Sequence, residues 1–152
     1  MDEIDGLRLE RLRGYADRAR PMHYAPYSDF IVLAAVEADD GQTYAGANIE
    51  IVNYSLCKHA EEVAILAAIV AGQDPRRPWL RAMYVAGAAP CGSCRQFMFE
   101  FATEDAVCVF ERIDQERLKA AGGVSAAGDG VPDVWRLSKL LPEAFGPREG
   151  LQ

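Results

Sequence analysis

The sequence predicts an α/β protein, a three-layer α/β/α sandwich with a central mixed β-sheet. Two β-type runs, residues 30–36 and 43–50, flank an Asp-Asp-Gly turn at residues 39–41, which is typical of a hairpin. After this hairpin, helical segments alternate with apolar strand segments, the order expected for a sheet covered by helices. A length of 152 residues fits one domain over residues 1–152 and is too short for two ordinary ones.

The first half of the chain contributes two of the predicted helices. Apolar side chains between Ile4 and Ala16 recur on one face of a helix, which Pro21 ends. Residues 21–29 are rich in turn formers and lead into the first strand of the hairpin. Residues 59–72 have the composition of a buried helix that stops at Gly72.

The second half continues the alternation and then loses it. We expect a third strand over residues 79–87, a second core helix over residues 91–102 and a fourth strand over residues 106–111. Residues 115–132 contain Ala-Ala-Gly-Gly and Gly-Asp-Gly, which predict a short helix followed by a flexible surface loop, an insertion. Periodicity returns over residues 134–141, and Pro142 ends it.

Charge and hydropathy narrow the class of partner. The 16 basic residues are dispersed among 23 acidic ones, for a formal net charge of -7, whereas a phosphate backbone needs clustered Lys and Arg. We therefore expect a small-molecule ligand and no nucleic-acid polymer. The longest apolar runs are too short to span a membrane, so no membrane partner is expected. The start of the chain lacks the basic and apolar regions of a signal peptide, which indicates a cytoplasmic protein.

A Cys-x-x-Cys motif with a preceding proline, residues 90–94, opens the second core helix. Cys91 and Cys94 share a helix face, so both sulfurs can reach one metal ion. The positive end of the helix dipole lowers thiol pKa and favours the thiolate that metals bind. The motif alone fits a thioredoxin-like redox pair equally well.

A second motif, His59-Ala60-Glu61, opens the other core helix and favours the metal. A catalytic zinc site needs three protein ligands, an open fourth position for water and a nearby group that moves protons. His59, Cys91 and Cys94 supply the ligands and Glu61 the proton carrier. The combination of H-x-E with P-C-x-x-C resembles the signature of zinc nucleobase deaminases, in which the Glu is not a ligand.

Simpler interpretations of the same residues stay open. A histidine at a helix start is more often a surface or capping residue, and a first-turn glutamate usually serves the helix dipole. A purely structural zinc site would need a fourth protein ligand, for which Cys57 is the candidate. We expect Cys57 to lie in the loop before the helix and to point elsewhere. Cys108, inside an apolar run, is expected to be a buried strand residue.

Over nearly its whole length the chain resembles the small, homotetrameric cytidine deaminase family. Four segments carry the resemblance: residues 24–30 (YAPYSDF), 46–50 (GANIE), 90–100 (PCGSCRQFMFE) and 140–145 (LLPEAF). Four features depart from the usual family pattern, and one of them is that the stretch of residues 115–132 is longer than expected. His59 stands where most tetrameric members carry Cys, Ile51 follows the motif glutamate where Asn is usual, and Leu33 replaces a glycine.

The resemblance implies a cytidine deaminase-like fold, a homotetramer and a set of site residues. Zn²⁺ would be held by His59, Cys91 and Cys94, with Glu61 as the catalytic acid and base. Phe30 would pack on the pyrimidine, Asn48 and Glu50 would bind the ribose 3′ hydroxyl, and the Ala60 backbone would contact the base. Val52, Tyr54 and Phe145 match positions that the family contributes to active sites of neighbouring subunits.

The implied activity is hydrolytic deamination of cytidine or deoxycytidine to uridine or deoxyuridine with release of ammonia, in pyrimidine salvage. Two alternatives remain at this point. The substrate could be a modified cytosine nucleoside, such as a blasticidin-like antibiotic or an N4-substituted cytidine. The chain could also be a zinc-stabilised nucleoside-binding protein without turnover, although an intact Glu61 argues for catalysis.

Overall fold

A five-stranded mixed sheet forms the middle layer of the fold, in the order β2-β1-β3-β4-β5. The structure is a computed structural model that describes residues 4–128 and 131–146. The strands are β1 (Leu33–Ala38), β2 (Thr43–Ala47), β3 (Leu80–Ala86), β4 (Ala102–Glu111) and β5 (Asp133–Arg136). The pairs β1–β2, β1–β3 and β4–β5 are antiparallel, whereas β3–β4 is parallel. The predicted mixed sheet, with its hairpin, is therefore confirmed.

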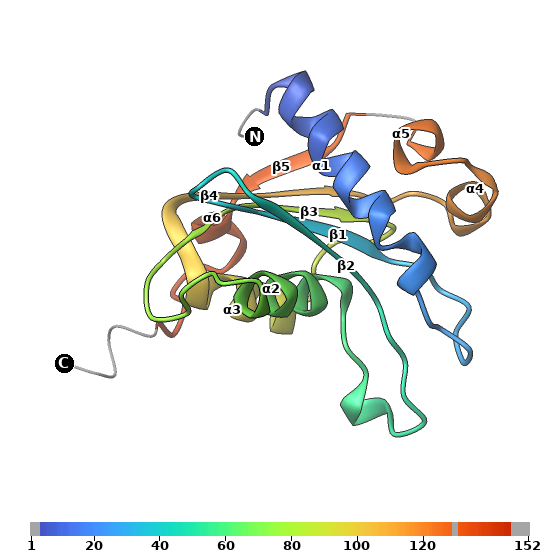
Figure 1. The fold of residues 1–152 in the computed structure, drawn as a ribbon, viewed down its shortest axis with the longest axis horizontal. Coiled ribbons are helices and arrows are strands. Elements are labelled where there is room, and N and C mark those ends of the chain that lie inside the picture. The colour runs from blue at the N-terminus through green and yellow to red at the C-terminus, as the bar shows by residue number, and fades with distance from the viewer. Residues whose placement is uncertain (1–3, 129–130, 147–152) are drawn as a thin grey trace.

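Helices cover both faces of this sheet. They are α1 (Gly6–Arg18), α2 (Ala60–Val70), α3 (Gly92–Phe101), α4 (Gln115–Ala120), α5 (Val124–Ala127) and α6 (Leu137–Leu140), with short 3-10 turns η1 (Arg20–Met22) and η2 (Tyr54–Leu56). Figure 1 shows α1 and α5 on one side of the sheet and α2 and α3 on the other. The three-layer α/β/α sandwich predicted from the sequence is confirmed.

The central strands are buried on both faces. Every residue of β1 is buried, and its side chains alternate between two cores. Leu33 and Ala35 pack in the core beneath α1, whereas Ala34 and Val36 pack in the core beneath α2 and α3. Strands buried on both faces appear in sequence as continuous apolar runs, which is why these strands could be located from the sequence.

Several predicted boundaries shift. β1 begins three residues later than predicted, at Leu33, and β2 ends at Ala47. Strand β4 begins at Ala102, directly after α3, although residues 103–105 (Thr-Glu-Asp) are polar. The periodic stretch 134–141 divides into β5, which pairs with β4, and the short helix α6.

The short helix predicted at the start of residues 115–132 is confirmed, whereas the flexible surface loop predicted after it is wrong for residues 124–127, which form a second helix. The segment 115–127 forms α4 and α5, and its residues Leu118 and Val124 are fully buried. Both side chains join the core beneath α1, so apolar burial outweighs the local Gly-Gly sequence. Residues 129–130 of the predicted insertion lie outside the described residues. Within the described part of the chain, no helix has the length and apolar character needed to cross a membrane.

Helix α2 approaches strand β2 so closely that one position on the strand has no room for a side chain. A Cβ atom added at Gly46 would overlap the backbone oxygen of Ala60 and the backbone nitrogen of Ala64. Because both clashing atoms belong to the helix backbone, a rotamer change cannot relieve the overlap. The glycine of the Gly-Ala-Asn-Ile-Glu segment therefore sets the position of the first turns of α2.

We expect Gly46→Ala to lower the free energy of unfolding by about 1–3 kcal/mol, the usual cost of overpacking a core. Gly14→Ala is the matched control, since a Cβ at this exposed position of α1 meets nothing within 4 Å. It should stabilise the protein by up to about 1 kcal/mol through helix propensity. Urea denaturation of both variants measures the difference, and equal stabilities would contradict the close approach.

Candidate active site and metal centre

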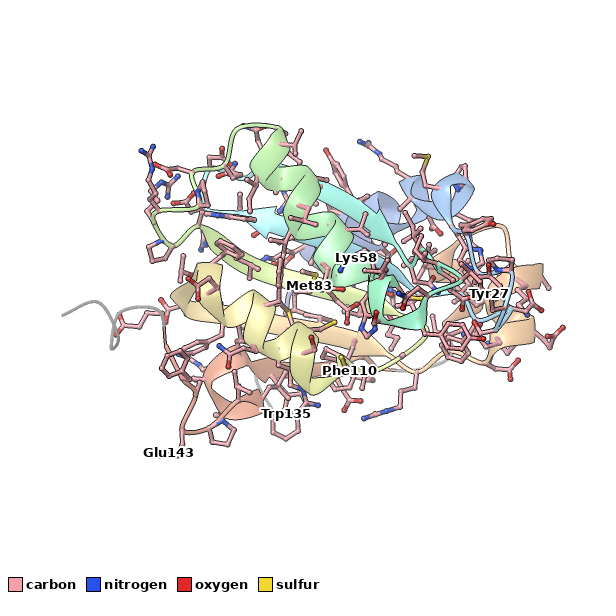
Figure 2. The ribbon with its side chains drawn as sticks, turned by 90° about the horizontal axis from the view of Figure 1, so that it is seen from below. Tyr27, Lys58, Met83, Phe110, Trp135 and Glu143 are labelled. Atoms are coloured by element: carbon pink, nitrogen blue, oxygen red, sulfur yellow. The ribbon has the colours of Figure 1, made fainter. Side chains whose placement is uncertain are left out.

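The N-terminal ends of α2 and α3 bring the predicted metal ligands together. His59 is the N-cap residue of α2 and Cys91 that of α3, and Cys94 lies in the first turn of α3. Figure 2 shows the two helices side by side over the sheet. The Nδ1 atom of His59 lies 3.2 Å from Sγ of Cys94 and 3.4 Å from Sγ of Cys91. The three ligand atoms lie within 4.8 Å of one another.

This donor set fits a tetrahedral zinc ion. A nitrogen about 2.0–2.1 Å and a sulfur about 2.3 Å from one zinc, at the tetrahedral angle, are roughly 3.6 Å apart. Both nitrogen-to-sulfur separations at His59 are close to that value. Two thiols and one imidazole are also the ligand types that zinc prefers.

Cys57 is not part of the group. Its Sγ accepts a hydrogen bond from the Ile51 backbone nitrogen at 3.2 Å and donates one to the Ile51 oxygen at 3.5 Å. Among the described residues, the one cluster of His, Cys and acidic side chains with metal-binding geometry contains His59, Cys91 and Cys94. The set thus has three protein donors, which is the number found in catalytic zinc sites rather than structural ones.

Glu61 lies beside the ligands and is almost fully buried, with 4% of its surface exposed. Burial raises the pKa of its carboxyl group, although hydrogen bonds from its own backbone and from Cys94 oppose that shift. Burial also raises the pKa of the Cys94 thiol, and the neighbouring Glu61 and Cys91 raise it further. A cation among these groups would have the reverse effect on the thiols, because metal binding favours the thiolate.

A local hydrogen bond fixes the backbone at His59. The His59 backbone nitrogen donates to Oε2 of Glu62 at 2.9 Å, so the third residue of the helix satisfies the amide of the N-cap residue. This is one half of a capping box, and it holds the chain at the point where it enters α2. Glu62 therefore has a local structural partner at the start of the helix.

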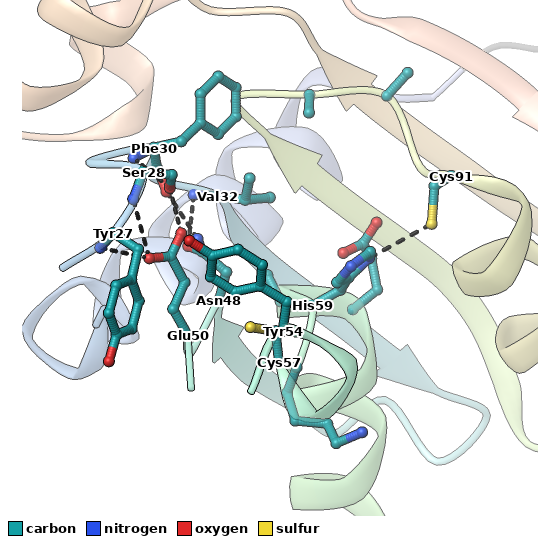
Figure 3. Close-up of a pocket in the computed structure, with 15 residues that line it drawn as sticks. Tyr27, Ser28, Phe30, Val32, Asn48, Glu50, Tyr54, Cys57, His59 and Cys91 are labelled. Atoms are coloured by element: carbon teal, nitrogen blue, oxygen red, sulfur yellow. Dashed lines mark hydrogen bonds between the residues drawn. The ribbon is translucent and has the colours of Figure 1, made fainter. Parts of the chain in front are cut away.

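His59, Cys91 and Glu61 line a pocket of about 580 Å³, a size typical of small-molecule sites, whereas Cys94 is fully buried beside it. In Figure 3, Phe30, Asn48 and Glu50 lie on one side of the pocket, and His59 and Cys91 lie on the other. The backbone at Ala60 also lines it. Several lining residues were not predicted from the sequence: Tyr27, Ser28, Val32, Lys58, Ala88 and Ala89. Tyr27 and Ser28 belong to the 24–30 segment already singled out by resemblance, so that segment was the available signal.

Asn48 and Glu50 hold the pocket wall and keep capacity for a further partner. Oδ1 of Asn48 accepts from the Val32 nitrogen at 2.8 Å, and Nδ2 donates to the Phe30 oxygen at 2.7 Å. Oε2 of Glu50 accepts from the Tyr27 and Ser28 nitrogens at 2.8 and 3.1 Å, and Oε1 accepts from the Ser28 hydroxyl. An amide has a second N–H and a carboxylate about four acceptor positions, so each side chain retains hydrogen-bonding capacity.

Of the three remaining predicted residues, one lines the pocket and two do not. Tyr54 lines the pocket of its own chain and is 72% exposed. Val52 and Phe145 are 78% and 75% exposed, and neither is among the residues that line the pocket. The single chain therefore brings together nine of the predicted site residues and leaves Val52 and Phe145 at the surface. The nine that line the site or hold its donor atoms are His59, Cys91, Cys94, Glu61, Phe30, Asn48, Glu50, Tyr54 and Ala60.

Comparison with known proteins agrees with this geometry. The sequence model of the cytidine and deoxycytidylate deaminase zinc-binding region matches residues 9–110. A cytidine deaminase of Mycobacterium tuberculosis is 35% identical over 144 residues, covering 91% of this chain and 92% of that protein. A cytidine deaminase of Sporosarcina psychrophila is 39% identical over 97 residues, covering 61% of this chain and 69% of that protein.

Solved structures show the same likeness. The crystal structure of cytidine deaminase from Burkholderia pseudomallei aligns with a TM-score of 0.70 and 33% identity, covering 90% of this chain and 98% of that one. That of cytidine deaminase from Mycobacterium tuberculosis aligns with a TM-score of 0.68 and 32% identity, covering 95% and 99%. With a family match over residues 9–110 and relatives of this identity over most of its length, the chain belongs to the cytidine and deoxycytidylate deaminase family and is an enzyme.

Proposed function

We propose that this enzyme catalyses the zinc-dependent hydrolytic deamination of cytidine and deoxycytidine, giving uridine or deoxyuridine and ammonia. The observation that carries the proposal is the buried Glu61 carboxyl beside three metal donors, in a pocket sized for a small molecule. The curated relatives described above are named cytidine deaminases, which supports the same substrate class. A place in cytoplasmic pyrimidine salvage belongs to this proposal and follows from the substrate.

His59, Cys91 and Cys94 hold the zinc ion in this proposal. When bound, zinc supplies a Lewis acid that lowers the pKa of a water molecule to about 7. Cys57 would not add a fourth protein donor, because its thiol forms hydrogen bonds with the backbone of Ile51.

Glu61 moves the protons. Its carboxylate takes a proton from the attacking water and delivers it to N3 of the cytosine ring while oxygen bonds to C4. The same carboxyl group then transfers the second proton of the water to the leaving amino group, which departs as ammonia. Burial suits Glu61 to this role, since a raised pKa brings a carboxyl closer to the pH at which it both accepts and donates protons.

The opposite side of the pocket recognises the nucleoside. The Phe30 ring packs against the flat base, which prefers aromatic contact, and the Ala60 backbone contacts its polar edge. The spare N–H of Asn48 and the spare acceptor of Glu50 form a donor and acceptor pair for one sugar hydroxyl. Both groups are held in place by the backbone of residues 27–32, so they need little ordering when the ligand binds.

The proposal includes a homotetramer with shared active sites. Val52, Tyr54 and Phe145 are apolar or aromatic side chains that are each more than 70% exposed. Their exposure leaves all three side chains available for contacts with neighbouring subunits, which the resemblance to the tetrameric family implies. Sedimentation of the purified protein tests the assembly, and a fully active monomer would contradict it.

We expect the purified protein to bind about one zinc ion per chain, because one set of three donors fills one site. Cys94→Ser should weaken zinc binding more than a hundredfold, since loss even of an outer-shell partner costs about 10–100-fold. Cys57→Ser is the matched control and should retain zinc, because its thiol binds the Ile51 backbone. Elemental analysis after dialysis against a chelator distinguishes them, and loss of zinc from both variants would point to a four-ligand structural site.

We expect the Glu61→Gln protein to keep its fold and its zinc. Its kcat should fall by roughly 10²–10⁴-fold, the range typical of acid and base residues. The amide preserves the shape of the side chain but cannot carry a proton between water and base. Steady-state ammonia release with cytidine and deoxycytidine gives kcat. A Glu61→Gln protein with near-normal kcat would rule out the proton-transfer role.

We expect free cytosine to be a poor substrate relative to cytidine, with kcat/KM lower by roughly 10²-fold or more. The physical reason is that Asn48 and Glu50 would lose the hydroxyl partner that a nucleoside provides. Kinetics with cytosine, cytidine, deoxycytidine and an N4-substituted cytidine measure the preference. Equal kcat/KM for cytosine and cytidine would argue against a nucleoside site, and a preference for the N4-substituted compound would favour the alternative substrate class.

A further inference from the structure

Helix α4 lies outside the pocket on its Phe30 side, and one of its side chains forms hydrogen bonds with the backbone there. The Ile31 nitrogen donates to Oε1 of Gln115 at 2.7 Å, and Nε2 of Gln115 donates to the Ile31 oxygen at 3.1 Å. One side-chain amide thus gives Ile31 both hydrogen bonds that a neighbouring strand would supply. Ile31 needs such a partner because β1 begins only at Leu33 and the Ile31 side chain is buried.

A glycine makes room for this contact. Gly87 follows β3 with a φ of +105°, and a Cβ atom there would lie 2.6 Å from the Ile31 oxygen and 3.4 Å from Nε2 of Gln115. The next residues, Ala88 and Ala89, line the pocket. The Gln115 contact therefore sits where the loop after β3 meets the segment that carries Phe30.

Helix α4 is itself firmly attached, so it can serve as a support. Leu118 is fully buried, and its backbone oxygen accepts a hydrogen bond from Nη1 of Arg20 at 2.8 Å. A second contact joins Nζ of Lys119 to Oδ2 of Asp29 at 2.6 Å, but the Asp29 side chain is 85% exposed. Exposed ion pairs contribute little, so Gln115 carries most of the connection.

We propose that Gln115 is a positioning residue of the active site, which holds Ile31 and thereby sets the Phe30 ring against the base of the substrate. This inference rests on the proposed function, in which Phe30 packs on cytosine. Gln115 touches neither the metal donors nor Glu61, which lie on α2 and α3 across the pocket. Its loss should therefore impair binding of the nucleoside while leaving proton transfer nearly intact.

The test compares Gln115→Met, which keeps the side-chain length but forms neither hydrogen bond, with Gln115→Glu, which keeps the acceptor for Ile31. For Gln115→Met we expect KM for cytidine to rise roughly 10- to 100-fold, the scale of small misplacements in an active site, with kcat within about threefold of the unmodified protein. The KM of Gln115→Glu for cytidine should lie between those of the unmodified protein and Gln115→Met. Lys119→Met should change KM less than about threefold, as an exposed ion pair predicts.

Val124→Ala is the control for stability. Val124 is a fully buried residue of α5, so truncating it should loosen the segment that contains α4 and α5 without removing a hydrogen bond to Ile31. It should lower stability and leave KM unchanged. Hydrogen–deuterium exchange of ligand-free protein provides a readout without substrate: residues 27–32 should exchange faster in Gln115→Met and not in Val124→Ala.

Three results would overturn the positioning role: an unchanged KM in Gln115→Met, an equal KM rise in Val124→Ala, or unchanged exchange at residues 27–32 in Gln115→Met. An unmodified protein that does not turn over cytidine would contradict the proposed function alone. The exchange comparison would then still decide whether Gln115 holds the segment.

Discussion

The first turn of helix α2 packs directly on strand β2, and most of the site depends on that contact. It is possible only because Gly46 has no side chain. The strand side of the contact continues to Asn48 and Glu50, two and four residues beyond the glycine. The helix side carries His59, which is the N-cap residue of α2. One steric constraint therefore sets the distance between the two sides of the pocket, and small errors in such distances are costly in catalysis.

The electrostatics of the site follow from the same packing. Burying the Glu61 carboxyl near the Cys94 thiol raises the pKa of both groups, chiefly through desolvation. Charges that are buried without compensation are expensive, so a folded protein retains such a cluster only where another interaction offsets the cost or function requires it. In the proposed function, a divalent cation held by one imidazole and two thiolates would offset it, and the metal and its ligands together would carry no net charge. The helix N-termini at His59 and Cys91 add partial positive charge on the same side.

The grouping of the metal donors could be predicted from the sequence, because it depends on pairs of residues that are close together in the chain. His59 and Glu61 are two residues apart at one helix start, and Cys91 and Cys94 are three apart at the other, so local helix geometry suffices to orient each pair. Buried strands and the two core helices were located by the same local rules. The contacts between segments were not predictable in this way. Gln115 and Ile31 are 84 positions apart, and the side-chain amide that joins them has no periodic pattern.

Local rules failed where tertiary packing outweighed them. The Gly-Gly sequence at residues 122–123 favours a loop, yet Val124 directly after it is fully buried and its backbone nitrogen donates to both carboxylate oxygens of Asp17. The glycines lie in the bend between α4 and α5, and the two apolar side chains buried on either side of it, Leu118 and Val124, stabilise the fold by roughly 1.5–3 kcal/mol each. The segment is therefore an integral part of the layer that covers the sheet, and a helix in that layer can support the pocket.

The pocket wall formed by residues 27–31 is held from two sides by side chains with different functions. On the pocket side, Glu50 and Asn48 hold the backbone and, in the proposed function, also bind the sugar. On the outer side, Gln115 holds the backbone and has no access to the ligand. Glu50 and Asn48 keep these hydrogen bonds in the proposed function and bind the sugar with their spare acceptor and spare N–H. The support from Gln115 on the outer side also holds the wall before the ligand arrives, so binding costs less conformational entropy.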